Sequence, residues 1–91
     1  MKYSIEYSTQ FKRDIRKVKR RGCDLNELFD IVEMLANDIA LPERNHDHPL
    51  IGKYAGCREC HIRPDWLLIY EKTNEIRLVS MLRTGSHSDL F

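Results

Sequence analysis

The 91 residues of the chain are 42% hydrophobic and 32% charged, with a formal net charge of +1 at pH 7, which is ordinary for a soluble globular protein. No apolar run is long enough to span a bilayer, residues 1–10 lack the apolar segment of a signal peptide, and three cysteines are an odd number for a disulfide framework. We therefore expect one domain over residues 1–91, in the cytoplasm, with reduced thiols and no membrane contact.

The first segment of the chain predicts a short strand followed by a helix. In residues 3–7 the aromatic or β-branched side chains alternate with others, which is typical of a strand. Ser8 can cap the helix that follows, and Gly22 favours its end. This helix would turn one narrow apolar stripe towards the core, formed by Phe11, Ile15 and Val18.

Residues 12–21, within this helix, are strongly basic. Seven of these ten residues are lysine or arginine, and one is aspartate. Such a stretch attracts phosphate groups, but it is equally compatible with a solvated helix face. The sequence leaves both interpretations open.

A second helix is the clearest element of the sequence. Asp24 and Glu27 have the spacing of a capping box, with Asp24 as the cap and Glu27 at the third helical position. Apolar residues then recur at helical spacing as far as Ile39, and Pro42 lies just beyond the expected end. Residues 42–56 show neither a helical nor a strand period, and a loop of this length in a small domain is uncommon unless it is functional or disordered.

The last third of the chain predicts three strands. The pattern becomes that of a strand from residue 57, and residues 63–65 indicate a tight turn around a proline. Residues 66–72 form a nearly continuous apolar strand, and residues 76–85 form another, followed by a short tail. The order β-α-α-β-β-β predicts an α+β fold, in which an antiparallel C-terminal meander is covered on one face by the two N-terminal helices.

The stretch Cys57-Arg58-Glu59-Cys60-His61 matches the C-x-x-C-H pattern that attaches haem in c-type cytochromes, and it also resembles half of a zinc site. In a strand, residues three apart point to opposite faces, so the thiols would lie roughly 10 Å apart at about 3.3 Å per residue. Haem attachment occurs outside the cytosol, and no second ligand pair has the spacing of a zinc knuckle. We therefore expect Cys60 in the core, His61 and Glu59 facing outward, and no metal or cofactor, with zinc as the less favoured alternative and no role assigned to Cys57.

A group of histidines with one aspartate suggests another chemistry. In this meander the long loop, the outer face of a strand and the tail can converge on the sheet face opposite the helices. Imidazoles can act as acid and base near neutral pH, a carboxylate can orient one of them, and an arginine can stabilise a pentavalent phosphorane. Such a group can cleave RNA without a metal, because the 2′-OH of the RNA is the nucleophile. The candidates are His48, His61, Asp65, Arg83 and His87.

Each candidate also has a purely structural interpretation. A lone His61 on a strand is usually a surface residue, Asp65 after a proline can be only a turn former, and Trp66 can be only part of the core. We interpret His46 as loop surface and leave it outside the site. Only the grouping on one face favours RNA cleavage, so a non-enzymatic module that binds RNA or protein through this face stays an alternative.

Three motifs together resemble the YafQ branch of the RelE/ParE toxin superfamily: DHPL at 47–50, CRECHIRPDWLLIY at 57–70 and RTGSHSDLF at 83–91. The expected order of elements also matches this family over nearly the whole chain. Its members are bacterial ribosome-dependent mRNA interferases of type II toxin–antitoxin systems. The resemblance therefore implies an endoribonuclease that uses no metal. The nearest alternative is a ParE-like toxin, which acts on DNA gyrase and would not need the histidine–aspartate group.

The resemblance also implies catalytic roles. Four residues fall on the catalytic positions of the family and would supply the general base, the general acid and transition-state stabilisation: His48, His61, Asp65 and His87. We favour His87 as the acid on the leaving 5′ oxygen, with Asp65 or His48 as the base. Arg83 would contact the scissile phosphate.

The RNA-binding surface implied by the resemblance is larger than the catalytic group. Trp66 and Phe91 would hold or stack a base of the A-site codon. Basic residues near the histidines would bind the RNA: Lys53, Arg58 and Arg63. Contacts to ribosomal RNA would come from the basic helix, through Lys12, Arg13, Arg16, Lys17, Lys19 and Arg20.

The partners that the resemblance implies are the ribosome with its mRNA and a cognate antitoxin, usually with a ribbon-helix-helix DNA-binding region. The antitoxin would neutralise the toxin, and the chain would reach operator DNA only through the antitoxin complex.

Overall fold

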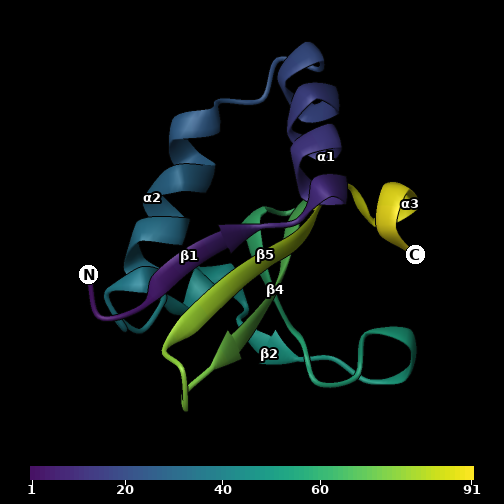
Figure 1. Ribbon diagram of the computed structural model, residues 1–91. Coiled ribbons are helices and arrows are strands. Elements are labelled where there is room, and N and C mark those ends of the chain that lie inside the picture. Colours follow the sequence, from purple (N-terminus) through teal and green to yellow (C-terminus); the bar gives the residue numbers. More distant parts are fainter.

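The computed structural model describes all 91 residues and confirms the α+β fold. A first strand is followed by two α-helices, and three long strands form the second half of the chain, in the expected order (Figure 1). The elements are β1 (Ser4–Tyr7), α1 (Thr9–Arg20), α2 (Leu25–Ala36), η1 (Glu43–Asn45), β2 (His48–Pro49), η2 (Gly52–Tyr54), β3 (Arg58–Arg63), β4 (Trp66–Thr73), β5 (Leu78–Gly85) and α3 (His87–Leu90), of which η1 and η2 are 3₁₀ turns.

The strands form one five-stranded sheet in the order β1-β5-β4-β3-β2. β3, β4 and β5 pair antiparallel as the predicted meander, and β2 adds a short antiparallel edge beside β3. The first strand runs parallel to β5 at the other edge, with Ile5 opposite Val79, so the sheet is mixed rather than purely antiparallel. β4 therefore has a neighbour on each side, and both of its faces are covered, which explains its nearly continuous apolar sequence.

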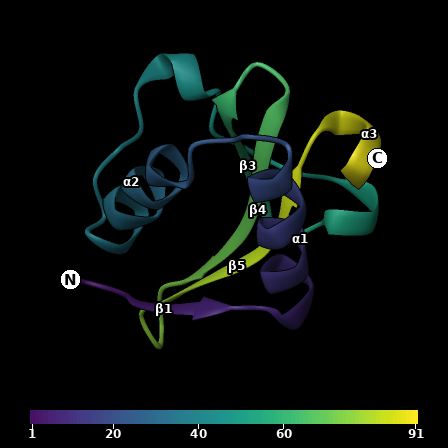
Figure 2. The same ribbon diagram turned by 90° about the horizontal axis from the view of Figure 1, so that it is seen from above.

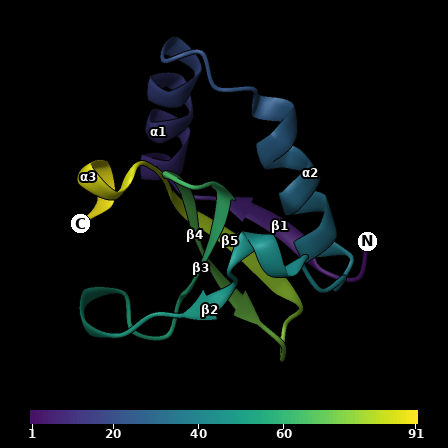
Figure 3. The ribbon, with the colours of Figure 1, turned by 180° about the vertical axis from the view of Figure 1, so that it is seen from behind.

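The core has two parts, one on each face of the sheet. α1 and α2 lie on the same face but apart from each other (Figure 2), and they pack on the main cluster through Phe11 and Leu28, against Leu68 of β4. On the opposite face, residues from the loop before β3 and from α3 cover a smaller cluster, and both segments lie at the same end of the molecule (Figure 3). This cluster contains Cys57, Leu67, Ile69 and Leu90. Full burial of one leucine contributes about 1.5–3 kcal/mol, so the two neighbours Leu67 and Leu68 fix β4 from both sides.

The alternation predicted for β3 is confirmed, but Glu59, which was expected to face outward with His61, is buried at 5% exposed. Cys60 is fully buried in the main cluster, whereas Cys57 belongs to the cluster on the opposite face, so the two thiols cannot bind one haem or one zinc ion together. Burial raises the pKa of the Cys60 thiol well above its usual range, which makes this thiol inert. All three cysteines are free.

The helix caps differ in part from the prediction. Ser8 caps α1 by accepting a hydrogen bond from the Phe11 amide at 2.9 Å, as expected. Asp24 caps α2, but Glu27 does not close the capping box, because its carboxylate forms an ion pair with Arg63 on β3. α2 also ends at Ala36 rather than at Ile39. None of the helices has the length and apolarity needed to cross a membrane.

Residues 42–56 and the C-terminal tail are more regular than predicted. The segment contains η1, β2 and η2, and the buried Asn45 donates a hydrogen bond to the carbonyl of His61 at 2.7 Å. The tail forms the short helix α3, which Ser86 and Asp89 close with a reciprocal capping box. Both segments are therefore held against β3 and β5 and can position side chains on one face of the sheet.

Candidate active site

Three histidines from distant segments meet at one end of the sheet, on the face opposite α1 and α2. His48 lies on β2, His61 on β3 and His87 at the start of α3. The His61 ring is central, because its centroid lies 6.4 Å from that of His48 and 5.7 Å from that of His87. The sequence left His46 outside the site, but its ring lies 5.4 Å from that of His61, so four imidazoles form one group.

Glu59 lies beneath this group and was missed as a site residue. Its side chain is 7% exposed, and Oε1 lies 3.4 Å from Nε2 of His61 and 3.6 Å from Nε2 of His48. Glu59 and His61 are two residues apart on a strand, so the sequence already placed them on the same face. The proximity of His48 comes from the pairing of β2 with β3, in which His48 lies opposite Glu59.

Backbone contacts fix the orientation of the His48 ring. Nδ1 of His48 lies 2.6 Å from the carbonyl oxygen of His46, which can only accept a hydrogen bond, so Nδ1 carries the proton. His46 itself adopts a left-handed backbone conformation with φ of 45° at the end of η1. In the neutral ring, Nε2 of His48 therefore keeps its lone pair and faces the group.

Asp65 positions His87. One carboxylate oxygen, Oδ1, accepts a hydrogen bond from the backbone amide of His87 at 2.9 Å and lies 2.6 Å from Nδ1 of the ring. These contacts hold the pKa of the Asp65 carboxyl below its usual range. An ionised Asp65 can only accept, so Nδ1 of His87 carries a proton and Nε2 is the atom free to face a substrate.

Arg83 is held by a buried carboxylate from the basic helix. Its Nε and Nη2 donate to Asp14 at 2.8 and 3.2 Å, and the Thr84 amide donates to the same carboxylate at 3.1 Å. Asp14 is the one acid of the basic stretch, is 5% exposed, and raises the pKa of Arg83. The Arg83 side chain is still 23% exposed, so a phosphate can approach a guanidinium whose direction is already fixed.

The two predicted aromatic contacts have different outcomes. Trp66 is 5% exposed in the main core cluster, where its indole N–H donates to Thr84 Oγ1 at 2.9 Å. Stacking on an RNA base needs an exposed ring face, so the structure does not support this role for Trp66. Phe91 is 64% exposed beside α3, at 5.8 Å from the Tyr54 ring, and is available for stacking.

Two of the three basic residues near the histidines have structural partners. Arg58 is paired with Asp47, which also accepts a hydrogen bond from Tyr70, and this network anchors the DHPL segment. Arg63 is paired with Glu27 and therefore links β3 to α2 rather than facing the histidines. Lys53 is exposed on η2, as an RNA contact requires.

The basic helix α1 is exposed along its predicted contact side. All six of its predicted ribosome-contact residues are exposed, but the Lys17 ammonium lies 3.0 Å from Asp89 of the C-terminal helix. Lys17 therefore has a partner within the chain, whereas the other five are in no ion pair: Lys12, Arg13, Arg16, Lys19 and Arg20.

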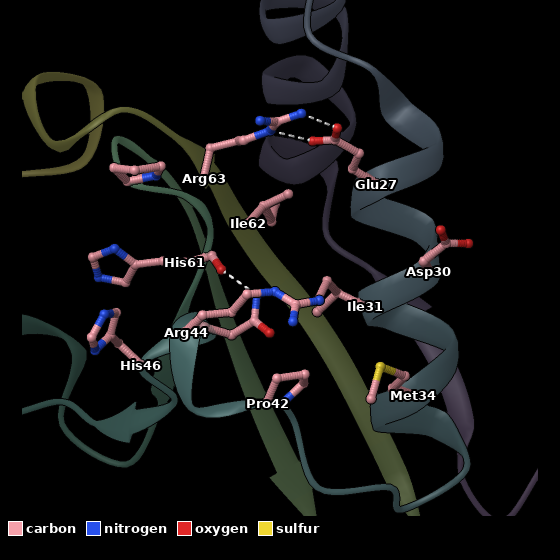
Figure 4. Close-up of a pocket in the computed structure, with 12 residues that line it drawn as sticks. Glu27, Asp30, Ile31, Met34, Pro42, Arg44, His46, His61, Ile62 and Arg63 are labelled. Atoms are coloured by element: carbon pink, nitrogen blue, oxygen red, sulfur yellow. Dashed lines mark hydrogen bonds and ion pairs between the residues drawn. The ribbon is translucent and has the colours of Figure 1, made fainter.

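A groove of about 760 Å³ lies between β3 and α2 (Figure 4). The ion pair between Arg63 and Glu27 crosses one end, and His46 and His61 border the groove with their rings directed away from α2 (Figure 4). Among the histidines, one ligand atom each from Glu59, His61 and His87 lies within 4.8 Å of the others, so these three residues could hold a metal ion.

Comparison with known proteins decides the family. Residues 3–91 match the model of a family described as the bacterial toxin of a type II toxin–antitoxin system, YafQ. The chain belongs to the YafQ toxin family. The mRNA interferase toxin YafQ of Escherichia coli strain K12 is 41% identical over 88 residues, which cover 96% of this chain and 94% of that protein.

Solved structures of the YafQ family share the fold. The crystal structure of the E. coli DinJ-YafQ complex superposes with a TM-score of 0.89 at 40% identity, covering 98% of each chain. That of a metal-bound toxin from Helicobacter pylori superposes with a TM-score of 0.91 at 38% identity, covering 98% of this chain and 99% of the other. The RelE-like fold expected from the sequence is thus confirmed.

Proposed function

We propose that this chain is an endoribonuclease that cleaves mRNA on the ribosome, as the toxin of a type II toxin–antitoxin system. Its membership of the YafQ family and its 41% identity to an mRNA interferase support the reaction class. The observation that carries the mechanism is the meeting of three imidazoles, from β2, β3 and α3, with Asp65 fixing one of them.

The reaction needs only proton transfer and charge stabilisation. A general base removes the proton of the 2′-OH, and the 2′ oxygen forms a bond to the adjacent phosphorus. The bond from phosphorus to the 5′ oxygen breaks, and a general acid protonates that leaving oxygen. The products are a 2′,3′-cyclic phosphate and a 5′-hydroxyl, so no water and no redox partner is consumed.

The geometry favours a division of the proton-transfer roles. His87 is the general acid in its doubly protonated form, because the Asp65 carboxylate at Nδ1 is the counter-ion of that ring and the proton on Nε2 passes to the leaving oxygen. His48 is the general base, because its Nδ1 proton is fixed by a carbonyl, which leaves the Nε2 lone pair available, and Glu59 Oε1 at 3.6 Å would stabilise the ring once Nε2 has taken up the proton. Asp65, which the sequence offered as the alternative base, is engaged twice by His87 and acts as its orienting group. His61 lies between the two and stabilises the charge that develops on the phosphate.

We infer that catalysis needs no metal ion. An ion bound by Glu59, His61 and His87 would occupy the nitrogen lone pairs of two imidazoles that the reaction uses. A metal there would therefore inhibit cleavage rather than assist it. The reaction should proceed at an unchanged rate in the presence of a chelator that binds transition metals but leaves the magnesium that ribosomes need, and loss of activity under this condition would contradict the proposal.

The partners follow from the same assignment. The E. coli relative is known in complex with DinJ, which supports a cognate antitoxin for this chain. We propose an antitoxin with a ribbon-helix-helix region, through which alone the chain would reach operator DNA. The exposed basic side of α1 would contact ribosomal RNA.

The test is cleavage on translating ribosomes, with mRNA 5′ ends mapped for the wild type and for His87→Ala. We expect cleavage in phase with the codons, and its loss in the variant. Inhibition of DNA gyrase without cleavage would instead indicate a ParE-like toxin, and binding without either activity would indicate an interaction module.

A further inference from the structure

The helix α3 carries His87 and directly precedes Phe91, but it is only four residues long. An isolated helix of one turn is unstable in water, because nucleation fixes several dihedral angles for a single hydrogen bond. The position of His87 must therefore come from contacts that α3 makes with the rest of the molecule. Leu90 supplies an apolar one, since it is 5% exposed in the smaller cluster.

The polar contact of α3 is made by Asp89. Its carboxylate receives both terminal nitrogens of Arg21, with Nη2 at 3.0 Å, and the Lys17 ammonium at 3.0 Å. The same carboxylate accepts a hydrogen bond from the Ser86 amide at 2.9 Å, which closes the capping box of α3. One side chain thus joins the N-terminal cap of α3 to the C-terminal end of α1.

The surroundings of Asp89 are built closely around it. Its side chain is only 12% exposed, although the Arg21 and Lys17 side chains are 44% and 50% exposed. Gly85 has φ of 154°, and a Cβ at this position would lie 2.8 Å from Asp89 Oδ2. The glycine therefore leaves the space into which the carboxylate fits.

An exposed ion pair alone contributes little to stability, because water and salt screen the charges and two side chains must be ordered. The Asp89 arrangement is different, because the arginine contact is bidentate, a second cation joins it and the carboxylate is largely shielded. Consistent with this, the contact with Arg21 and the Ser86 amide hold the pKa of Asp89 far below its usual range. The contact therefore persists at every pH at which the protein would act.

We propose that Asp89 is a positioning residue for RNA cleavage, which holds α3 against Lys17 and Arg21 and so keeps His87 aligned on Asp65. The proposal rests on the proposed role of His87 as general acid. It also assigns to Lys17 and Arg21 a structural function in holding α3, distinct from the attraction of ribosomal RNA by the rest of α1. Misplacement of a catalytic group by about 1 Å can cost up to about 100-fold in rate.

The variant Asp89→Asn distinguishes a positioning role of Asp89 from a simple effect of its charge on RNA binding. Asparagine keeps the shape and the capping acceptor but removes the negative charge. Loss of positioning predicts a fall in kcat of about 10-fold or more on ribosome-bound mRNA, with little change in KM. Simple attraction predicts the opposite, because removing a negative charge would tighten RNA binding and lower KM with kcat unchanged.

Arg21→Gln and its neighbour Arg20→Gln form the matched pair of controls. Both remove one positive charge from the end of α1, but Arg20 is in no ion pair. Arg21→Gln should lower kcat as Asp89→Asn does, whereas Arg20→Gln should raise KM alone. The double variant Asp89→Asn/Arg21→Gln should be no slower than either single variant, because both changes remove the same contact.

A measurement that needs no activity completes the test. Amide hydrogen exchange of Leu90 and Phe91 should become faster in Asp89→Asn, while the thermal midpoint of the whole protein changes by only a few degrees, roughly as expected for a local change. Unchanged exchange of these amides, or an unchanged kcat in the variant, overturns the proposal. A wild type that cleaves no mRNA would instead refute the proposed function, and the exchange result would still decide whether Asp89 holds α3.

Discussion

The replacement Asp14→Ala tests whether Asp14, the acid within the basic helix, holds the Arg83 guanidinium in place. The change removes two hydrogen bonds from the guanidinium and one from the Thr84 amide, which is buried. A hydrogen bond to a charged group contributes about 1.5–3 kcal/mol, but the partly exposed Arg83 recovers some hydration once released. An unpaired buried amide costs about 1–3 kcal/mol, so the whole change should lower the free energy of unfolding by about 3 kcal/mol.

Urea unfolding measures this difference. For a protein of this size the slope of free energy against urea is about 1 kcal/mol/M, so the midpoint should fall by about 3 M. Asp30→Ala is the matched control, since it removes one carboxylate from the exposed face of α2 and no ion pair, and its effect should stay within about 0.5 kcal/mol. If Asp14→Ala and Asp30→Ala have the same unfolding midpoint, the contacts of Asp14 with Arg83 and Thr84 contribute nothing to stability, and the claim that Asp14 holds Arg83 in place is wrong.

Three further predictions follow from the site. His61→Ala should lower cleavage by about 10²- to 10³-fold, because it removes one stabilising contact to the phosphate, without changing the unfolding midpoint by more than a few tenths molar. Equal activity would remove His61 from the catalytic group. His87 and Arg21 depress the pKa values of Asp65 and Asp89. The contributions of these two carboxylates to folding stability should therefore be complete above about pH 4 and be lost as the pH falls through their lower pKa values in the folded protein. The NMR chemical shift of the His87 amide should accordingly titrate below about pH 4 rather than at pH 4. Trp66→Phe should destabilise the fold by about 1–2 kcal/mol through the lost bond to Thr84, with KM for ribosomes unchanged; a raised KM at unchanged stability would restore the stacking role.

The sequence was sufficient for the order of elements because periodicity is local. The stripe of Phe11 and Val18 and the alternation of Cys60 with His61 identify the faces of α1 and β3 without any tertiary information. The parallel pairing of β1 with β5 was not predicted, because it joins residues more than seventy positions apart and leaves no local pattern.

For the candidate site, the sequence pointed to three of the four grouped histidines and to Asp65, but it missed three other carboxylates. Histidine is rare enough on one face to attract attention, but Glu59, Asp14 and Asp89 look like ordinary surface acids in the sequence. Their roles depend on contacts across the fold, such as that of Asp14 with Thr84. Trp66 was expected to hold an RNA base but lies in the core. An aromatic residue beside a turn can lie on either face of the sheet, and the hydrogen bond from the indole to Thr84 that accompanies its burial is a tertiary contact, which the sequence does not show.

The chemical nature of the cleavage ends tests the central claim most directly. Ribosomes carrying one defined mRNA are treated with the protein in a single turnover, with magnesium kept and a chelator selective for transition metals added, and the ends of both fragments are identified. Attack by the 2′-OH, with His48 as base and His87 as acid, predicts a 2′,3′-cyclic phosphate on one fragment and a 5′-hydroxyl on the other. A 3′-hydroxyl with a 5′-phosphate, or no cleavage until a transition-metal ion is added, would contradict the account.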